Sequence, residues 1–406
     1  MPPTVMVLAV IAFFVAVGFG VVVPVLPVFA RSFHVGQLET GLVVSAFALV
    51  RLATGPFTGP LISRLGERTV LSGGVLIVAG SSAAMGLAGS YPELLVWRAA
   101  GGLGSSMFTV SAMTLLIRTV DAGRRGRAVA LYQTGFLIGN MAGPAVGGLL
   151  AALSLRAPFF FYAGTLLAAA LVGWVFLRDT SAPGPAADAP VATSFRRVLA
   201  DVRYQAALAC SFANGWSSLG VRSSLIPVLV VEVLHRDTVF TGVAMAVASV
   251  IQTLVIGPSG TLVDRYGRRP AMIAGSLVGA AALAGIALVP RASGPIPPAT
   301  WVVILLCVYA VAVALMGTAP AATVGDVAPG GSGSAVAAFS MASDAGQILG
   351  PIVAGAIADH VGVPAGFASG AVLMVVAALA SARMPRASIR RPRPPRTTDD
   401  GAPQPG

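Results

Sequence analysis

Long apolar runs, separated by short stretches rich in charge, proline and glycine, fill most of this sequence. A bilayer core about 30 Å thick requires roughly 20 consecutive apolar residues in a helix. Because lipid offers the backbone no hydrogen-bonding partners, only helices and closed barrels can cross it, and these runs are too long for barrel strands. We therefore predict twelve membrane-spanning helices, at residues 5–29, 40–63, 70–90, 93–117, 128–152, 158–177, 205–231, 240–263, 271–290, 301–324, 335–358 and 364–383.

Composition supports an all-α integral membrane protein. The 406 residues are 56% hydrophobic and only 10% charged, whereas soluble domains carry about 25% charged residues. The net charge of +11 would fit a nucleic-acid partner, but the position of the arginines indicates another role. Most of those outside the spans fall on one side, which predicts a bacterial cell membrane protein with both termini cytoplasmic and no nucleic-acid partner. The inner side would hold Arg64, Arg68, Arg118, Arg124, Arg125, Arg127, Arg178, Arg196, Arg197, Arg203, Arg265, Arg268, Arg269 and six in the tail, and the outer side Arg31, Arg156, Arg236 and Arg291.

The sequence also contains an internal repeat. Residues 59–74 match residues 260–275, and residues 126–148 match residues 333–355. Each half would therefore hold six helices in the same order, with a central cavity at the interface between the halves, where rocking alternates access. We predict a six-helix bundle at 1–178, a linker at 179–203, a second bundle at 204–384 and a disordered basic tail at 385–406.

The first pair of matched stretches resembles the loop motif of the major facilitator superfamily. Its residues here are Gly59, Arg64, Gly66 and Arg68 in the first half, and Gly260, Asp264, Arg265, Gly267, Arg268 and Arg269 in the second. The first copy has Ser63 and Glu67 where the family usually has Asp and Arg. We expect the glycines to allow a tight turn and close helix approach, and Asp264 to engage a helix N-terminus in the opposite half. Asp121 and Asp326 are expected to pair with Arg68 and Arg269 as state-dependent latches; the alternative is that these arginines only determine topology.

The second pair resembles the motif associated with exporters (antiporters) of this family. It comprises Gly139, Gly143, Pro144, Gly147 and Gly148, with Gly346, Gly350 and Pro351 at matching places in the other half. Small residues spaced by four predict close contact between the first and fifth helices of each half, and the proline predicts a kink. Export is implied by the resemblance alone; generic glycine-rich packing is the alternative.

Four charged residues lie well inside predicted spans, at Arg51, Arg98, Arg222 and Asp344. A charge at mid-membrane costs about 2.5–3.5 kcal/mol on insertion scales, so each is a functional candidate. Arg98 resembles the helix-four arginine that the family associates with proton coupling. Asp344 is the one carboxylate well inside a span and is the candidate proton carrier; the alternative is a structural partner of Arg222.

The remaining polar side chains at cavity positions are candidates for substrate contact or for hydrogen bonding between helices. They are Tyr132, Gln133, Asn140, Asn214 and Gln347. We predict a monomeric, proton-coupled exporter of small apolar or amphipathic compounds, with a metabolite symporter and a non-transporting sensor as alternatives. The chain has no lysine, which excludes a Walker A loop. No metal-ligand spacing or nucleophile–base pattern appears, so we expect neither an enzyme nor a cofactor.

Overall fold

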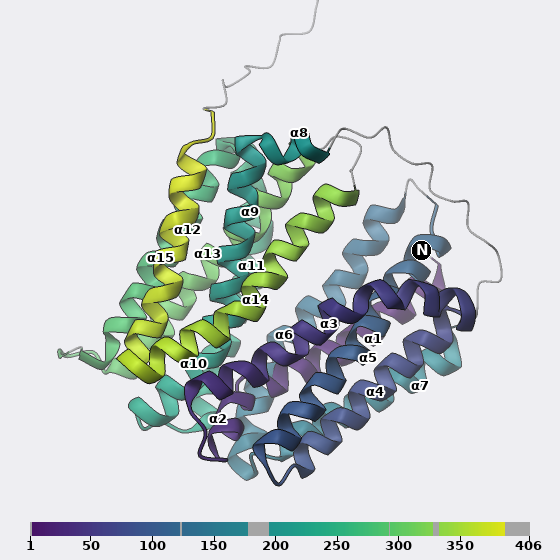
Figure 1. Cartoon of the computed structure of the whole chain (residues 1–406), viewed down its shortest axis with the longest axis horizontal. Coiled ribbons are helices and arrows are strands. Elements are labelled where there is room, and N and C mark those ends of the chain that lie inside the picture. The colour runs from purple at the N-terminus through teal and green to yellow at the C-terminus, as the bar shows by residue number, and fades with distance from the viewer. Residues whose placement is uncertain (1, 122–123, 178–194, 292, 328–332, 386–406) are drawn as a thin grey trace, which may run out of the picture.

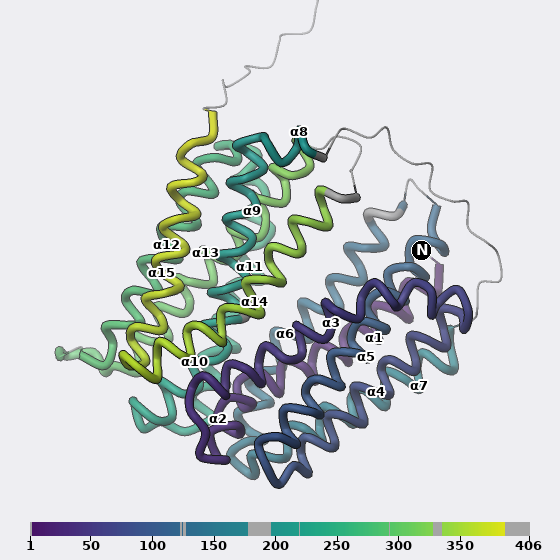
Figure 2. The backbone as a smooth tube through the Cα atoms, in the orientation of Figure 1, coloured from purple at the N-terminus to yellow at the C-terminus, as the bar shows by residue number. Residues whose placement is uncertain are grey.

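The computed structural model describes residues 2–121, 124–177, 195–291, 293–327 and 333–385 (Figures 1 and 2). Within these ranges the chain is helical and contains no strand. Twelve helical stretches are long and apolar enough to cross a membrane, as predicted. The predicted tail after its first residue and most of the predicted linker lie outside the described residues; within the described part of that linker is a short helix, α8 (Phe195–Ala200).

The helices pack into two bundles of six spans each. The first bundle, the N-half, contains α1 (Pro3–Val22), α2 (Leu26–Arg31), α3 (Gln37–Leu65), α4 (Glu67–Leu87), α5 (Tyr91–Thr119), α6 (Arg125–Leu153) and α7 (Ala157–Phe176). The second bundle, the C-half, contains α9 (Val202–Gly215), η2 (Trp216–Val221), α10 (Arg222–Val228), η3 (Leu229–Val233), α11 (Thr238–Tyr266), α12 (Arg268–Leu288), η4 (Val289–Arg291), α13 (Pro298–Val327), α14 (Gly333–Val361) and α15 (Val363–Ala382).

Two predicted spans are less regular than expected. The span predicted at 5–29 ends at Val22 and resumes as the short helix α2, because Pro24 has no N–H for the helix ladder. The span predicted at 205–231 contains two π-helical stretches, η2 and η3, on either side of α10. Such wide turns are rare and concentrate at functional sites.

Each half has its own apolar core, and large apolar side chains also cover its outer surface. Phe159 in α7 and Phe367 in α15 are fully buried, whereas Phe57 is 74% exposed. Exposed apolar side chains are compatible with a lipid environment and would be unfavourable in water.

In the described ranges, the two halves meet toward one end of the molecule, which we call the closed end. There α3 packs against α14, α6 against α11 and α2 against α10. Among the described residues, the hydrogen bonds and ion pairs that join the halves lie between this end and mid-span. Toward the other end, where α1 begins and α15 finishes, the bundles splay apart (Figure 1). We call this the open end.

Candidate functional site

A cavity of about 520 Å³ lies between the two halves. Helices α1, α3, α5, α6 and α7 line it on one side, and η2, α10 and α11 on the other. Its N-half wall carries four phenylalanine rings, Phe19, Phe47, Phe108 and Phe136. Its C-half wall consists of hydroxyl, amide and guanidinium side chains with one methionine, namely Ser218, Arg222, Ser223, Met245, Ser249, Gln252 and Thr253. The N-half wall also contributes polar side chains, among them Ser105, Thr109, Gln133 and Asn140, so the cavity offers both aromatic and polar contacts.

A smaller cavity of about 120 Å³ adjoins the first. Both are lined by Phe19, Phe47, Arg51 and Ser223, and the smaller one adds Arg98 and Gln347. Three of the four charged residues predicted inside the spans, all of them arginines, thus line this pair of cavities.

The fourth, Asp344, forms an ion pair across the two halves. Arg51 on α3 donates from Nη2 to Oδ1 of Asp344 on α14, at 3.1 Å. The side chains keep 33% and 25% of their surface exposed, so water reaches the pair. The alternative prediction, that Asp344 pairs with Arg222, is therefore wrong. The two residues of the pair face each other because α3 crosses α14 at the interface, whereas Arg222 lies on α10.

Arg98 is buried between aromatic rings and has no ion pair or hydrogen bond with a described residue. It is 4% exposed, and its Nε and Nη1 atoms are buried without a partner. The guanidinium carbon lies 4.4 Å from the ring centre of Phe47 and 5.8 Å from that of Phe19. Contacts of this kind contribute about 0.5–2 kcal/mol, less than the cost of about 2.5–3.5 kcal/mol for a charge in mid-membrane. The rings alone do not compensate this cation.

Arg222 is the second cation of the site without an acid partner among the described residues. Its Nε atom is buried without a hydrogen bond, and its guanidinium lies 6.0 Å from the ring centre of Tyr309. The residue follows directly on the π-helical stretch η2, whose wide turns precede it on the cavity wall.

Most of the predicted cavity residues line these cavities. Tyr132, Gln133 and Asn140 line the larger one and Gln347 the smaller one. Asn214 does not line either, and its Oδ1 atom is buried without a partner.

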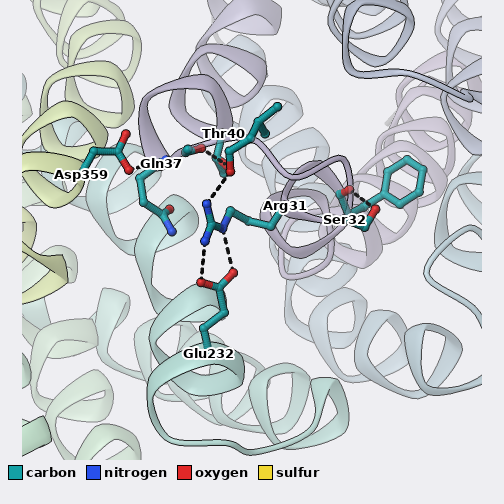
Figure 3. Close-up of polar contacts among 9 residues, drawn as sticks. Arg31, Ser32, Gln37, Thr40, Glu232 and Asp359 are labelled. Carbon is teal, nitrogen blue, oxygen red and sulfur yellow. Dashed lines mark hydrogen bonds and ion pairs between the residues drawn. The ribbon is translucent and has the colours of Figure 1, made fainter.

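An ion pair joins the halves at the closed end (Figure 3). Arg31, at the end of α2, donates to both carboxylate oxygens of Glu232 in η3, at 2.8 and 2.9 Å, and also to the carbonyl of Val35. The hydrogen bond to Glu232 raises the pKa of Arg31. The arginine therefore stays charged.

A second polar contact at the closed end caps a helix of the opposite half. The carboxylate of Asp359, in the last turn of α14, accepts hydrogen bonds from the backbone N–H groups of Gln37 and Leu38, both at 2.8 Å (Figure 3). These residues begin α3, whose N-terminus carries unpaired N–H groups and a partial positive charge. An acid of the C-half thus holds a helix of the N-half.

The sequence analysis did not predict these contacts between the halves. Arg31 entered it only as a determinant of topology, and Asp359 was not considered. The available signal was their position, since Arg31, Glu232 and Asp359 all fall at span ends on the same predicted side.

Comparison with known proteins identifies the family. The family model described as Major Facilitator Superfamily matches residues 8–257 and 207–405. The chain belongs to the major facilitator superfamily. It is therefore a transporter and a multi-pass membrane protein, not an enzyme, as predicted.

Individual relatives in this superfamily share part of the sequence or the whole fold. Quinolone resistance protein NorA of Staphylococcus aureus is 29% identical over 172 residues, which are 41% of this chain and 43% of that protein. Multidrug resistance protein 2 of Bacillus subtilis is 30% identical over 164 residues, 40% of this chain and 41% of that protein. The match thus spans about two-fifths of the length of these relatives. A bacterial homologue of the human lysosomal transporter Spinster, in an inward-facing and unoccupied conformation, has a TM-score of 0.76 at 17% identity and covers 93% of this chain and 96% of its own.

The superfamily loop motif lies at the open end. Gly66 and Gly267 have φ angles of 81° and 92°, a backbone region that favours glycine, so both make the predicted tight turn. Gly59 and Gly260 have no atom within 4 Å of the position a Cβ would take. The close helix approach predicted there is absent in this conformation, because the halves are apart at this end.

The predicted latches have other partners in the structure. Arg68 donates to the carbonyl of Trp174 and lies over its ring, not against Asp121, which is exposed. Arg269 donates to the carbonyl of Ala382 at 2.8 Å. The partner of Asp326 is Arg268, at 2.9 Å, which corrects the prediction of Arg269.

The remaining charges of the motif also stay within their own halves. Asp264 is 76% exposed and pairs with Arg268 at 3.3 Å, so in this conformation it does not engage a helix N-terminus of the N-half. Arg64 and Arg265 are exposed. In the first half Glu67 accepts a hydrogen bond from Arg118 and is buried, so the residue that departs from the usual motif has its own partner.

The predicted glycine packing is present in both halves. A Cβ at Gly143 would lie 2.6 Å from the backbone of Gly20 on α1, and Gly139 and Gly147 meet α1 in the same way. In the C-half a Cβ at Gly350 would lie 2.7 Å from the Trp216 carbonyl, and Gly346 likewise meets the backbone at the α9–η2 junction. The first and fifth helices of each half are therefore in backbone contact, as the small-residue spacing predicted.

Two members of the same motif lie against the opposite half. A Cβ at Gly148 would lie 2.6 Å from the carbonyl of Thr238 on α11, which corrects its assignment to the first helix. The carbonyl of Pro351 faces Gly41 on α3. Pro144 and Pro351 both lie inside their helices, each with a residue across the interface as neighbour.

Proposed function

We propose that this protein is a proton-driven exporter of small amphipathic compounds, which works by alternating access between its two halves. The observation that carries the proposal is the Arg51–Asp344 ion pair. Arg51 lines both cavities, so the pair links the one mid-span carboxylate of the described residues to the cavity wall and joins the two halves. Protonation would neutralise Asp344 and remove this ionic contact between the halves.

The direction of transport rests on the arginine asymmetry and on the resemblance to exporters. If the arginine-rich side faces the cytoplasm, the open end does so too, and this conformation takes up substrate from inside the cell. Both named relatives with partial sequence matches, the quinolone and multidrug resistance proteins, carry names that fit removal of toxic compounds.

The proposed cycle uses the ion pair as the link between protons and rocking. In the conformation seen here Asp344 is paired with Arg51 and substrate can load. A proton that arrives from the outside would neutralise Asp344 while the opposite conformation is open, and its release to the cytoplasm would restore the pair. Inward movement of each positive charge gains about 2.3 kcal/mol per 100 mV, which is enough to drive accumulation.

The test measures transport by the Asp344→Asn variant in proteoliposomes, with a small amphipathic antibiotic as the substrate. Uphill transport driven by a pH gradient should be lost, while downhill exchange of labelled for unlabelled substrate should persist. Asp201→Asn, which changes an acid at the start of α9 outside the cavity, serves as the control and should transport normally. A variant at Asp344 that still concentrates substrate would refute the proton role, and gradient-driven uptake in the opposite direction would indicate a symporter.

A further inference from the structure

We infer that the transported compounds are amphipathic anions, whose negatively charged group binds at Arg222 and Arg98. This inference rests on the proposed transport function and names its substrate class. It follows from the balance of charge around the two cavities and from the aromatic rings and polar side chains that line them.

The charge balance inside the spans is positive. Arg51, Arg98 and Arg222 line the cavities, against the single carboxylate of Asp344. Arg51 already pairs with that carboxylate. Two guanidinium groups therefore remain without a counter-ion among the described residues.

Both of these cations are set up to receive an anion. Arg98 is almost fully buried, lines the smaller cavity and has two nitrogen atoms without a hydrogen bond. Arg222 lines the larger cavity and also has a buried nitrogen without a partner. Guanidinium groups bind carboxylates, sulfonates and phosphates through paired, charge-assisted hydrogen bonds, which are stronger than neutral ones. An arriving anion would satisfy groups that the protein itself leaves unpaired.

The side chains on the cavity walls would recognise the rest of the compound. Ser223 lines both cavities, next to Arg222, and Ser218 faces the larger one, so hydroxyl donors accompany the cation on the C-half. The rings of Phe108 and Phe136 lie on the N-half wall and suit an aromatic or aliphatic body. A compound with an apolar body and an anionic group would contact both walls at once, whereas an organic cation would meet uncompensated positive charge.

The charge also fits the proposed direction of movement. An anion that leaves an inside-negative cell moves down the membrane potential. Proton entry in the opposite direction adds to the same driving force, so export of an anion requires no coupling beyond that already proposed.

The experiment compares three probes that share one apolar body. These are 1-pyrenebutyrate, 1-pyrenebutanol and 1-pyrenebutylammonium, and their binding is measured by calorimetry on the full chain in lipid nanodiscs, with empty nanodiscs subtracted. The wild type should bind the butyrate about tenfold or more tightly than the other two. Arg222→Gln and Arg98→Gln should each remove that preference and leave butanol binding within about twofold.

Binding of 1-pyrenebutanol also reports whether each variant is folded. The matched control is Arg291→Gln, because Arg291 is exposed and does not line the cavity. If either arginine variant fails to fold, the inference is tested by the order of the three affinities in the wild type and by the other variant. Equal or tighter binding of the cation or the alcohol by the wild type would overturn the inference, as would an anion preference that survives both variants. Since no gradient is applied, failure of proton-driven export would leave this result unaffected, and the reverse also holds.

Discussion

At the scale of single residues, the membrane interior of this protein contains few charges, and each has a distinct environment. Asp344 and Arg51 neutralise each other across the interface, whereas Arg98 lies between phenylalanine rings. The sequence alone identified all of these residues, because a charge in an apolar run is conspicuous. It could not identify their partners, since these come from helices that are distant in the chain and touch only after the two halves have docked.

The first prediction concerns the energetics of that pair. Arg51→Gln and Asp344→Asn should each lower thermal stability, because each leaves one charge uncompensated in a largely apolar setting, with a cost of about 1–2 kcal/mol after allowance for water access. The double variant should recover most of the loss. Thermal unfolding of the purified proteins followed by size-exclusion fluorescence measures this. Losses that simply add would show that the two side chains do not interact.

At the scale of the elements, the repeat and the small-residue spacing carried most of the predictive information. The contacts of Gly143 with α1 and of Gly350 with the helix at Trp216 follow from that spacing. The assignment of Gly148 failed because a glycine face says only that some backbone comes close, not which one. The π-helical turns at η2 and η3 were not predicted, because one extra residue in a turn leaves the run long and apolar enough to read as a single span.

This difference between glycines yields the second prediction. Gly143→Leu should abolish transport by forcing α1 and α6 apart within the N-half. Gly148→Leu should instead push α6 away from α11 at the closed end. The variant should therefore favour the conformation in which this end is open. A Ser45→Cys reporter, at a residue that is 2% exposed and donates to Ile348 of the opposite half, should react with an impermeant maleimide faster in the Gly148 variant. Cys210 and Cys307 would be replaced by serine beforehand. An unchanged labelling rate would show that Gly148→Leu does not open this end.

The third prediction concerns the two copies of the loop motif. Asp264→Asn should reduce transport several-fold more than Ser63→Ala, because the change removes a charge that pairs with Arg268 here and that can meet a helix N-terminus when the open end closes. Ser63 only donates to the carbonyl of Pro60 in its own helix. Initial transport rates at matched expression compare the two variants. Equal rates would show that neither copy controls the conformation.

At the scale of the whole molecule, one end is held together by polar contacts between the halves and the other end is apart. Arg31 with Glu232, and Asp359 with the start of α3, form a pair of contacts that must break before the closed end can open. The sequence predicted acid–helix contacts between the halves, but at the opposite end, through Asp264. It could not indicate which end is closed, because both ends carry charges and a transporter visits both conformations.

The last prediction tests these contacts as the elements that hold this conformation. An exposed bidentate pair contributes about 1 kcal/mol, and a carboxylate at a helix N-terminus about as much. Removal of both by Glu232→Gln with Asp359→Asn should therefore shift the ratio of the two conformations by roughly 30-fold toward opening of the closed end. Labelling of the Ser45→Cys reporter should accelerate accordingly. Glu93→Gln is the matched control, because Glu93 lies at the same end but accepts a hydrogen bond from Gly89 within its own half, so its loss leaves the interface intact. If the double variant labels at the rate of this control, the apolar contacts of α3 with α14 and of α6 with α11 hold the closed end without these charges.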